Sequence, residues 1–512
     1  MKKRALIIIL CAAAAAVVVL LICAAQLDLS PDSDFSVTLE TDGSHVKSWQ
    51  SDDGSYYLFL PHSVSIPDLS FSCEGIRVKN VSSGTYDSKT HTVSGAFQKS
   101  GDTLTITSRN RQTYELTVMQ TDLPDIMIDL TEDTSLDEIN GGLKETRYEG
   151  NTAILIDRDG TADPQTDVTI KGRGNSTWSF ATKKSYQIRF SEKIPVFGME
   201  PSKKWILQAN AFDETMMRNQ IAFQASRDLG MAYTPEYVYT NVWVDGEYIG
   251  VYTVGESVEI GKGKLELEDP EGIVAELDSA YYMDNDYWFE TEIDNFGVKE
   301  TVSEEDADIN AGIVDFRAKY EGLWNYLNET ESTEVTLEGI SQYIDVDSFV
   351  KMFFLLEFYR NTDAYITSTY FYQDGADDVI RFGPVWDYDC SMGSSSSESL
   401  ASPEGTDYLR GAVITKLMDT PAFSRYAAEY YDYNKEKFEY SLQYCEDLYK
   451  QLAPSAEMNY TRWEHALGGS HTAEYDVKHD IAAFHESYSA GCEYLKEWLK
   501  TRLEVFAPAA AG

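Results

Sequence analysis

Residues 357–389 read EFYRNTDAYITSTYFYQDGADDVIRFGPVWDYD, and this stretch decides the predicted fold. Its first residues end a helix that is predicted over Ile344–Tyr359, where apolar residues recur at helical spacing. The rest predicts an antiparallel hairpin, with Tyr365–Gln373 as the first strand and Val379–Val385 as the returning strand.

Carboxylate side chains stand at both ends of this predicted hairpin. Asp363 precedes the first strand, and Asp387 and Asp389 follow the second strand, 24 and 26 residues later. Because paired residues of antiparallel strands have Cα atoms about 4.5–5.5 Å apart, Asp363 is expected to face Asp387 or Asp389. Clustered carboxylates repel one another unless a cation or a proton neutralises them, and Mg²⁺ prefers oxygen ligands. The pattern therefore predicts a magnesium site, with turn-capping aspartates as the alternative.

A second feature is the local excess of basic residues between Lys171 and Lys204. Eight Lys and Arg residues and two Glu residues give this window a charge of 8 − 2 = +6, within a chain of formal charge −43. The window opens with the turn KGRGNSTW (171–178), where glycine lets backbone N–H groups approach an anion. Its candidate anion-binding residues are Arg173, Asn175, Ser176, Lys183 and Lys184. A solvated basic face is the alternative.

We predict one long mixed domain over residues 124–512. Its first half is expected to be rich in strands and its second half in helices, which is an α+β, bilobal arrangement. The predicted strands include Thr169-Ile170, Ser185–Phe190, Trp205–Leu207, Val238–Val244 and Gly250–Val254. The predicted helices are Glu214–Asp228, Asp308–Leu327, Ile344–Tyr359 and most of 411–452 and 473–506.

Two further segments precede this domain. Residues 1–30 begin with basic residues and continue into an uncharged run of 21 residues, Ala5–Ala25. A signal-peptide core has about 7–15 apolar residues and a membrane-spanning helix about 20. The run is therefore predicted to be a transmembrane signal anchor with the bulk of the chain outside the cell, and a cleaved signal peptide is the alternative. Residues 31–123 carry short alternating strands between turn signals, which predicts a small Ig-like β-sandwich that serves as a spacer or interaction module.

The composition argues against several other classes of protein. The chain has 85 Asp and Glu residues against 42 Lys and Arg residues, and this negative field repels nucleic acid. No His lies between His91 and His465, which argues against a zinc enzyme or a Ser-His-Asp triad. A glycosidase with paired carboxylates would leave the basic window without a role. Cys445 and Cys492 either pair or remain two buried thiols.

An Asp before a hairpin and a second Asp after it is also the layout of protein kinases. The kinase motifs H-R-D, D-F-G, A-P-E and G-x-G-x-x-G are absent from the sequence, which excludes an ordinary protein kinase. The motifs that do occur are, in chain order, GRGNS (172–176), KKSY (183–186), FGM (197–199), KWIL (204–207), Asp213 with Arg218-Asn219, GEYIGVY (246–252) with Glu256, YIDVDSF (343–349), NTD (361–363) and GPVWDYD (383–389). From about Pro124 to Pro508 this set resembles the CotH family, relatives of the spore-coat protein H, which is an atypical secretory-type protein kinase.

The resemblance implies a remotely kinase-like fold that binds ATP and Mg²⁺ and phosphorylates Ser or Thr of exported proteins. By position, Asp363 matches the catalytic Asp and Asp389 the metal-binding Asp, with Asp387 and Asn361 as further metal ligands. The residues expected at the cofactor are Arg173, Asn175, Ser176, Lys183, Lys184, Arg218 and Glu256. Lys183 or Lys184 is expected to hold phosphates, whereas the family roles of Arg218 and Glu256 do not follow from the sequence.

Two hypotheses of function follow. The first is a membrane-anchored kinase that acts on extracytoplasmic or cell-surface proteins. The second is a catalytically silent surface adhesin or binding module on the same fold, which would suit the acidic ectodomain and the β-sandwich.

Overall fold

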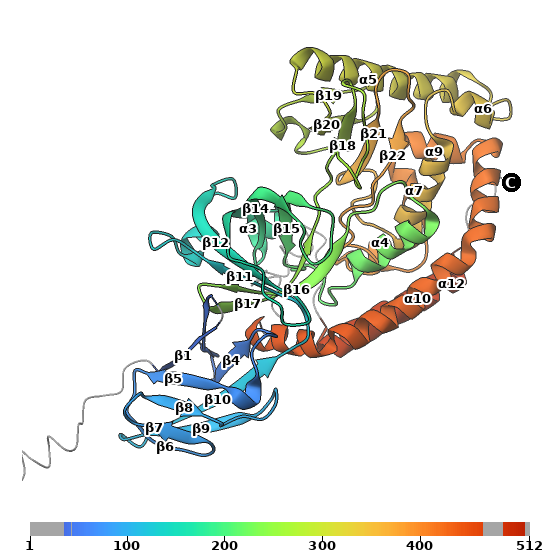
Figure 1. Cartoon of the computed structure of the whole chain (residues 1–512). Coiled ribbons are helices and arrows are strands. Elements are labelled where there is room, and N and C mark those ends of the chain that lie inside the picture. The colour runs from blue at the N-terminus through green and yellow to red at the C-terminus, as the bar shows by residue number, and fades with distance from the viewer. Residues whose placement is uncertain (1–34, 42, 464–484, 507–512) are drawn as a thin grey trace, which may run out of the picture. The chain divides into compact units, whose positions relative to one another are not determined.

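The computed structural model describes residues 35–41, 43–463 and 485–506 (Figure 1). The chain divides into two compact units. Unit 1 comprises the residues up to Thr121 together with the turn Asp245–Tyr248, and unit 2 comprises the remainder. The predicted signal anchor lies outside the described residues. Within the described ranges, no helix combines the length and the apolar content needed to cross a bilayer.

Unit 1 consists of two five-stranded sheets with the strand orders β2-β1-β5-β8-β7 and β3-β4-β10-β9-β6. Successive side chains of a strand point to opposite faces, and in β9 Leu104 and Ile106 are accordingly buried. Phe35, which precedes β1, packs against Tyr56 of the second sheet with 4.7 Å between the ring centroids. The elements are β1 (Ser36–Glu40), β2 (His45–Lys47), β3 (Trp49–Gln50), β4 (Tyr56–Leu60), η1 (Ile66–Asp68), β5 (Ser70–Glu74), β6 (Val78–Val81), β7 (Thr85–Asp87), β8 (Thr92–Ser94), β9 (Thr103–Ser108) and β10 (Thr113–Gln120).

Unit 2 opens with a closed barrel whose strand order is β11-β12-β13-β14-β15-β17-β16. The parallel pairing of β11 with β16 closes it. Ile170, Ile188 and Trp205 belong to its buried core. The sequence predicts most of these strands one by one, and their closure into a barrel is an additional finding. The elements of this part are β11 (Asp125–Asp129), α2 (Leu136–Gly141), β12 (Tyr148–Ile156), β13 (Thr166–Arg173), α3 (Ser176–Phe180), β14 (Ser185–Ile194), β15 (Ser202–Gln208), α4 (Arg218–Leu229), β16 (Tyr237–Val244) and β17 (Glu247–Gly255).

The rest of unit 2 combines helices with a five-stranded sheet of order β19-β20-β18-β21-β22. Its elements are β18 (Ile273–Leu277), η2 (Tyr282–Asp284), β19 (Trp288–Glu290), β20 (Asn295–Thr301), α5 (Asp306–Glu329), α6 (Leu337–Ile340), α7 (Val346–Tyr359), β21 (Thr369–Gln373), β22 (Arg381–Phe382), α8 (Glu398–Ala401), η3 (Tyr408–Arg410), α9 (Ala412–Met418), α10 (Pro421–Trp463) and α12 (Tyr488–Val505). The predicted α+β class is therefore confirmed, with a barrel and a separate sheet in the same unit.

Several predicted boundaries need correction. The helix expected from Glu214 begins at Arg218, because Asp213 first caps a turn by accepting a hydrogen bond from Thr215 N (3.0 Å). The helical region expected over 411–452 is divided into α9 and α10, and α10 continues to Trp463. The region expected over 473–506 contains α12, and its first residues lie outside the described ranges.

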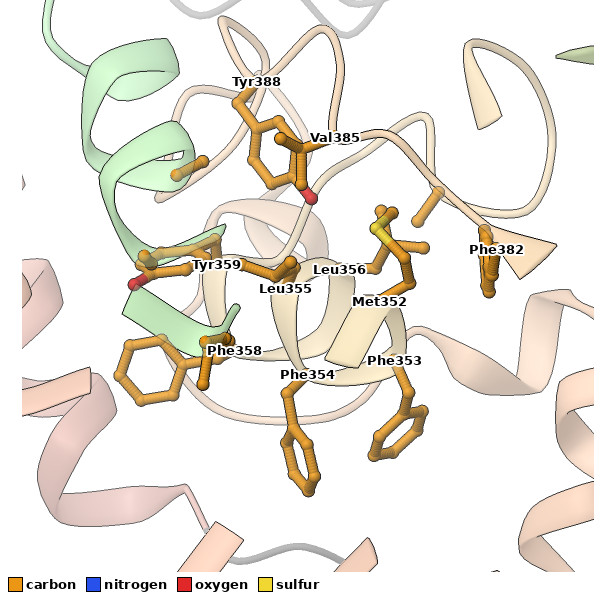
Figure 2. Close-up of a cluster of buried hydrophobic side chains, with 14 of the residues drawn as sticks. Met352, Phe353, Phe354, Leu355, Leu356, Phe358, Tyr359, Phe382, Val385 and Tyr388 are labelled. Atoms are coloured by element: carbon orange, nitrogen blue, oxygen red, sulfur yellow. The ribbon is translucent and has the colours of Figure 1, made fainter. Parts of the chain in front are cut away.

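Helix α7 is the centre of the core that supports the predicted hairpin. It is buried on nearly all sides, as expected for a helix inside a large core. Figure 2 shows Val385 and Tyr388 lying over α7 on one side and Phe382 beside Met352, so the segment after β22 packs on the helix that precedes the hairpin. The hairpin itself is shorter than predicted. Its strands are Thr369–Gln373 and Arg381–Phe382, and irregular segments join them to the carboxylates.

Candidate active site

Three aspartate side chains gather where the hairpin of β21 and β22 begins and ends. The pairing of the two strands brings the flanking segments together, and Thr362 N donates a hydrogen bond to Cys390 O (3.0 Å). Asp389 is buried, whereas Asp363 and Asp387 are half-buried. Burial, and then the charges of Asp387 and Asp363, raise the pKa of the Asp389 carboxyl well above its usual range. The structure thus holds the three predicted carboxylates close enough to repel one another.

Asn361 joins the two ends of the hairpin. Its Oδ1 accepts a hydrogen bond from Asp363 N (2.9 Å), and its Nδ2 donates one to Asp387 O (3.0 Å). Asn361 is buried and does not line the neighbouring cavity. The sequence places it among the metal ligands. The structure instead gives it a bridging position, because both atoms of its amide group already bind backbone.

Strained backbone conformations concentrate in the same region. Asp387, Ser368, Tyr365 and Arg360 have positive φ angles of 59°, 50°, 63° and 48°. Such conformations cost residues other than glycine about 1–3 kcal/mol each, and they cluster at functional sites, where the surrounding structure enforces them. Ser368 also donates a hydrogen bond from Oγ to Asp387 Oδ2 (3.0 Å). The conformation of Asp387 is therefore fixed from both the backbone and the side chain.

The first residues of α4 hold the segment that contains Asp387 and Asp389. Asn219 Oδ1 accepts a hydrogen bond from Tyr388 N (2.8 Å). Arg218 Nε donates one to Ser391 O (3.0 Å), and the same guanidinium forms a buried ion pair with Asp213. Buried hydrogen bonds of this kind are costly to break, since the remaining partner stays desolvated. Arg218 and Asn219 are thus positioning residues for the segment.

We expect Asn219→Ala to lower the turnover of any reaction that uses Asp387 and Asp389 by about tenfold, since small displacements of positioned groups carry costs of that order or greater. The reason is that Tyr388 N would lose its buried acceptor and the segment would gain freedom. The measurement is kcat and KM of the variant beside its melting temperature. Ser226→Ala is the matched control, because Ser226 makes a buried hydrogen bond from the same helix to Thr234, outside the site. Equal losses of kcat in the two variants would contradict the positioning role.

The three carboxylates line a cavity of about 670 Å³. Its walls come from the barrel, the β18–β20 region and the two ends of the hairpin. Acidic residues exceed basic ones on these walls. The acidic residues are Glu145, Glu276, Asp278, Asp284, Asp363, Asp387 and Asp389, and the basic ones are Lys144, Arg173, Lys299 and Arg410. Seven against four gives 4 − 7 = −3, so an anionic ligand requires accompanying cations in this cavity.

The turn that opens the basic window also reaches the cavity. Arg173, Asn175 and Ser176 line it, and the Arg173 guanidinium lies 5.4 Å from the centre of the Trp386 ring. Gly174 has φ of +90°, a conformation that favours glycine. The structure therefore brings one end of the predicted basic window to the predicted carboxylates, although about 190 residues of chain separate them.

The comparison with known families agrees with this arrangement. The family model for CotH, described as CotH kinase protein, matches residues 170–506. The chain belongs to the CotH kinase family. The match covers most of the chain and includes both the turn at Arg173 and the carboxylates, and it confirms the resemblance that the sequence motifs indicate. The comparison with curated proteins found no match.

Two lysines expected to hold phosphates in this CotH-family chain do not reach the cavity. Lys183 is fully buried, and its Nζ donates hydrogen bonds to Val251 O, Ala209 O (3.2 Å) and Asn459 Oδ1 (3.0 Å). Burial lowers the pKa of its ammonium group well below the usual range. Lys184 donates to Trp178 O and lies over the Trp178 ring. The expected phosphate role does not fit these positions, because three polar acceptors already surround Lys183 inside the core.

Arg218 and Glu256, also expected at the cofactor, lie away from the cavity walls. Arg218, at the start of α4, is buried and binds Ser391 O and the Asp213 carboxylate. Glu256 is buried, where its Oε2 accepts hydrogen bonds from Tyr233 Oη and Glu236 N (both 3.0 Å). Both residues therefore support neighbouring segments in this structure.

The structure adds cavity residues that the sequence analysis missed. Lys299 of β20 pairs with Glu276 of β18 at 2.5 Å between Nζ and Oε2, and both line the cavity. Trp386 lines it as well, with Tyr370 at 5.9 Å between ring centroids. Glu276 and Lys299 occupy strands without a motif around them, whereas Trp386 belongs to the motif GPVWDYD (383–389). Only the position of Trp386 beside Asp387 was a signal from which one of them could have been inferred.

Proposed function

We propose that this chain is an ATP- and Mg²⁺-dependent phosphotransferase that transfers the γ-phosphate of ATP to Ser or Thr hydroxyl groups of proteins. The observation that carries the proposal is the shared cavity in which Asp363, Asp387 and Asp389 face the turn with Arg173. Membership of the CotH kinase family supports the same class of reaction. A remotely kinase-like arrangement of the α7–hairpin region is part of the proposal.

The cavity is chemically suited to Mg²⁺. Asp389 is buried beside two further carboxylates, and a bound cation would relieve the repulsion between them. Among the described residues, no three His, Cys, Asp or Glu side chains already form a metal-binding group. Mg²⁺ usually takes only one or two protein carboxylates and completes its shell with water and phosphate oxygens. Asp389 and Asp387 are the residues that would hold it.

Different residues of the cavity have different roles in the proposed reaction. Asp389 and Asp387 would hold Mg²⁺, which would supply positive charge to the phosphates; the bond between the γ-phosphorus and the ADP oxygen breaks as the acceptor oxygen bonds to phosphorus, and ADP leaves with the electron pair. Asp363 orients the acceptor hydroxyl and takes its proton while the hydroxyl oxygen forms the new bond to phosphorus. Arg173 supplies positive charge to the phosphate oxygens, and Lys299, paired with Glu276, adds positive charge to the cavity wall. The chain thus provides a base, metal ligands and counter-charges on separate elements.

The compartment of the reaction is a proposal from the sequence. The basic start and the uncharged run Ala5–Ala25 suggest export with retention in the membrane, and a cleaved signal peptide is the alternative. Acceptors would then be extracytoplasmic or cell-surface proteins, and nucleic acid is not among the proposed partners. A membrane fraction that lacks the mature chain would indicate cleavage.

Binding of ATP tests the proposal directly. The dissociation constant of ATP is measured by calorimetry, with Mg²⁺ and with EDTA, for residues 31–512. We expect binding that depends on Mg²⁺, because the cavity walls are net negative. Arg173→Ala is expected to weaken it by about tenfold, the effect of losing one charge-assisted contact.

Lys184→Ala is the control for this measurement. The sequence places Lys184 at the phosphates, whereas the structure directs it to Trp178, so we expect the affinity for ATP to change by less than about twofold. Lack of ATP binding to the parent in the presence of Mg²⁺ would contradict the proposed function and favour the adhesin hypothesis.

A further inference from the structure

Exposed apolar side chains gather at one edge of the cavity. Tyr281, Met283, Trp288 and Ile366 are 53%, 57%, 44% and 36% exposed, and we call these four residues the apolar rim. Tyr281 and Ile366 line the cavity themselves. Met283 follows on the connection from β18 to β19, and Trp288 is the first residue of β19.

The rim is held by hydrogen bonds and ring packing. Asp278 Oδ1 accepts hydrogen bonds from Ala280 N (2.9 Å) and Tyr281 N (3.0 Å). Ser279 N donates one to Ile366 O (2.9 Å), which joins the β18–β19 connection to the segment after Asp363. The rings of Tyr282 and Trp288 meet edge to face at 5.6 Å. The rim is therefore a formed surface, contributed by two segments that are far apart in the sequence.

One residue of the apolar rim, Ile366, lies three residues after Asp363, the proposed base. Ile366 N and Thr367 N both donate hydrogen bonds to Asp363 O (3.0 and 3.1 Å). These bonds hold the backbone of Ile366 beside the backbone of Asp363. An acceptor hydroxyl that reaches Asp363 brings its neighbouring residues past Ile366 and Tyr281, which line the same cavity.

The other exposed apolar side chains include some far from the cavity lining and some next to it in the sequence. Val314, Tyr433 and Tyr440 lie on α5 and α10 and none of them lines the cavity. Leu143 and Leu409 each directly precede a cavity-lining residue. Single exposed apolar side chains are common on protein surfaces, whereas a contiguous group marks an interaction site. The position of the apolar rim beside the cavity therefore indicates a ligand with apolar groups.

We infer that the apolar rim binds apolar side chains next to the phosphorylated Ser or Thr of an acceptor polypeptide. The inference rests on the proposed function, because the position of Asp363 identifies which ligand passes the rim. A small hydroxyl compound would fill the cavity without covering Met283 and Trp288, which lie beyond its lining. A polypeptide extends beyond the cavity on either side of the acceptor residue, by about 3.3–3.6 Å per residue, and can therefore reach them.

The test uses peptide binding, which does not depend on phosphate transfer. Two labelled peptides carry one Ser that is flanked on both sides by Leu in the first and by Asn in the second. Fluorescence anisotropy measures their dissociation constants with the full-length protein. We expect the parent to bind the Leu peptide at least about tenfold more tightly. The double variant Met283→Asn/Ile366→Asn should reduce this preference to less than about threefold, and Val314→Asn, an exposed apolar residue outside the rim, should keep it.

Each outcome has a separate meaning. Equal binding of the two peptides by the parent, or an undiminished preference in a double variant that melts like the parent, overturns the inference. Self-association of the parent that the double variant abolishes, without any preference between the peptides, also overturns it in favour of a second copy of the chain. Preference for the Leu peptide without phosphate transfer supports the inference and contradicts the proposed function. Phosphate transfer to both peptides with equal kcat/KM supports the proposed function and contradicts the inference about the apolar rim.

Discussion

Replacing Asp363 by Asn is expected to reduce phosphate transfer by about 10²–10⁴-fold, the contribution that a positioned general base makes. Asn keeps the size of the side chain but cannot take the proton of the acceptor hydroxyl. The backbone of Asp363 carries the local structure, through the bond from its N–H to Asn361 Oδ1 and the bonds that its O accepts. The substitution leaves these bonds in place, so the fold of the turn should persist.

The loss should fall on kcat. Asp363 is proposed to act on the acceptor, so the affinity for Mg²⁺–ATP should stay within about twofold of the parent. Single-turnover transfer to a Ser peptide and calorimetry with Mg²⁺–ATP separate the two effects. Asp294→Asn is the matched control, because Asp294 is another half-buried carboxyl, hydrogen-bonded to Tyr320 and outside the cavity lining. If the Asp363 variant transfers phosphate at the parental rate, Asp363 is not the base.

Replacing Asp389 by Asn is expected to remove both binding and transfer. A metal ligand contributes to nucleotide binding as well as to the chemical step. We expect Mg²⁺–ATP to bind at least about tenfold more weakly, a loss of about 1.4 kcal/mol or more. Mg²⁺–ATP should then no longer raise the melting temperature at concentrations that stabilise the parent. The difference from the Asp363 variant, which keeps its affinity, is the decisive comparison.

Stability without Mg²⁺ provides a check on the same variant. Asp389 is buried beside Asp387 and Asp363, whose charges disfavour its ionised form. Asn removes one of the three clustered negative charges, so the metal-free variant should melt at or above the temperature of the parent. A large fall in the melting temperature would indicate that Asp389 supports the fold through contacts of its own. The loss of ATP binding would then not identify a metal ligand.

The fold was predictable where local patterns are strong. The period of apolar residues in α7 and α5 indicates these helices within two residues of their observed ends. Strands β14 to β17 were indicated by their apolar content. Their order around the barrel was not, because β11 pairs with β16 across more than 100 residues of chain. Pairing between strands so far apart depends on the topology of the whole domain, and a local sequence pattern does not specify it.

The candidate site was predictable only in part, and the lysines illustrate why. Charge at Lys183 and Lys184 indicated a phosphate-binding strand. The direction of each side chain depends on what surrounds it, and Asn459, 276 residues further along the chain, accepts a hydrogen bond from Lys183 in the core. The pair Glu276–Lys299 was missed for the converse reason, since two ordinary strand residues become partners only when β18 lies beside β20.

By itself, the sequence determined that Asp363 lies before a hairpin and Asp387 and Asp389 after it, because a turn and two short strands are local features. It also indicated the family, which the family model confirms, because a set of motifs in a fixed order is specific to a family. Only the tertiary structure decided which charged residues surround one cavity. Arg173 and Lys299 line the cavity, whereas Lys183 does not. The reason is that packing between distant elements determines the position of each side chain.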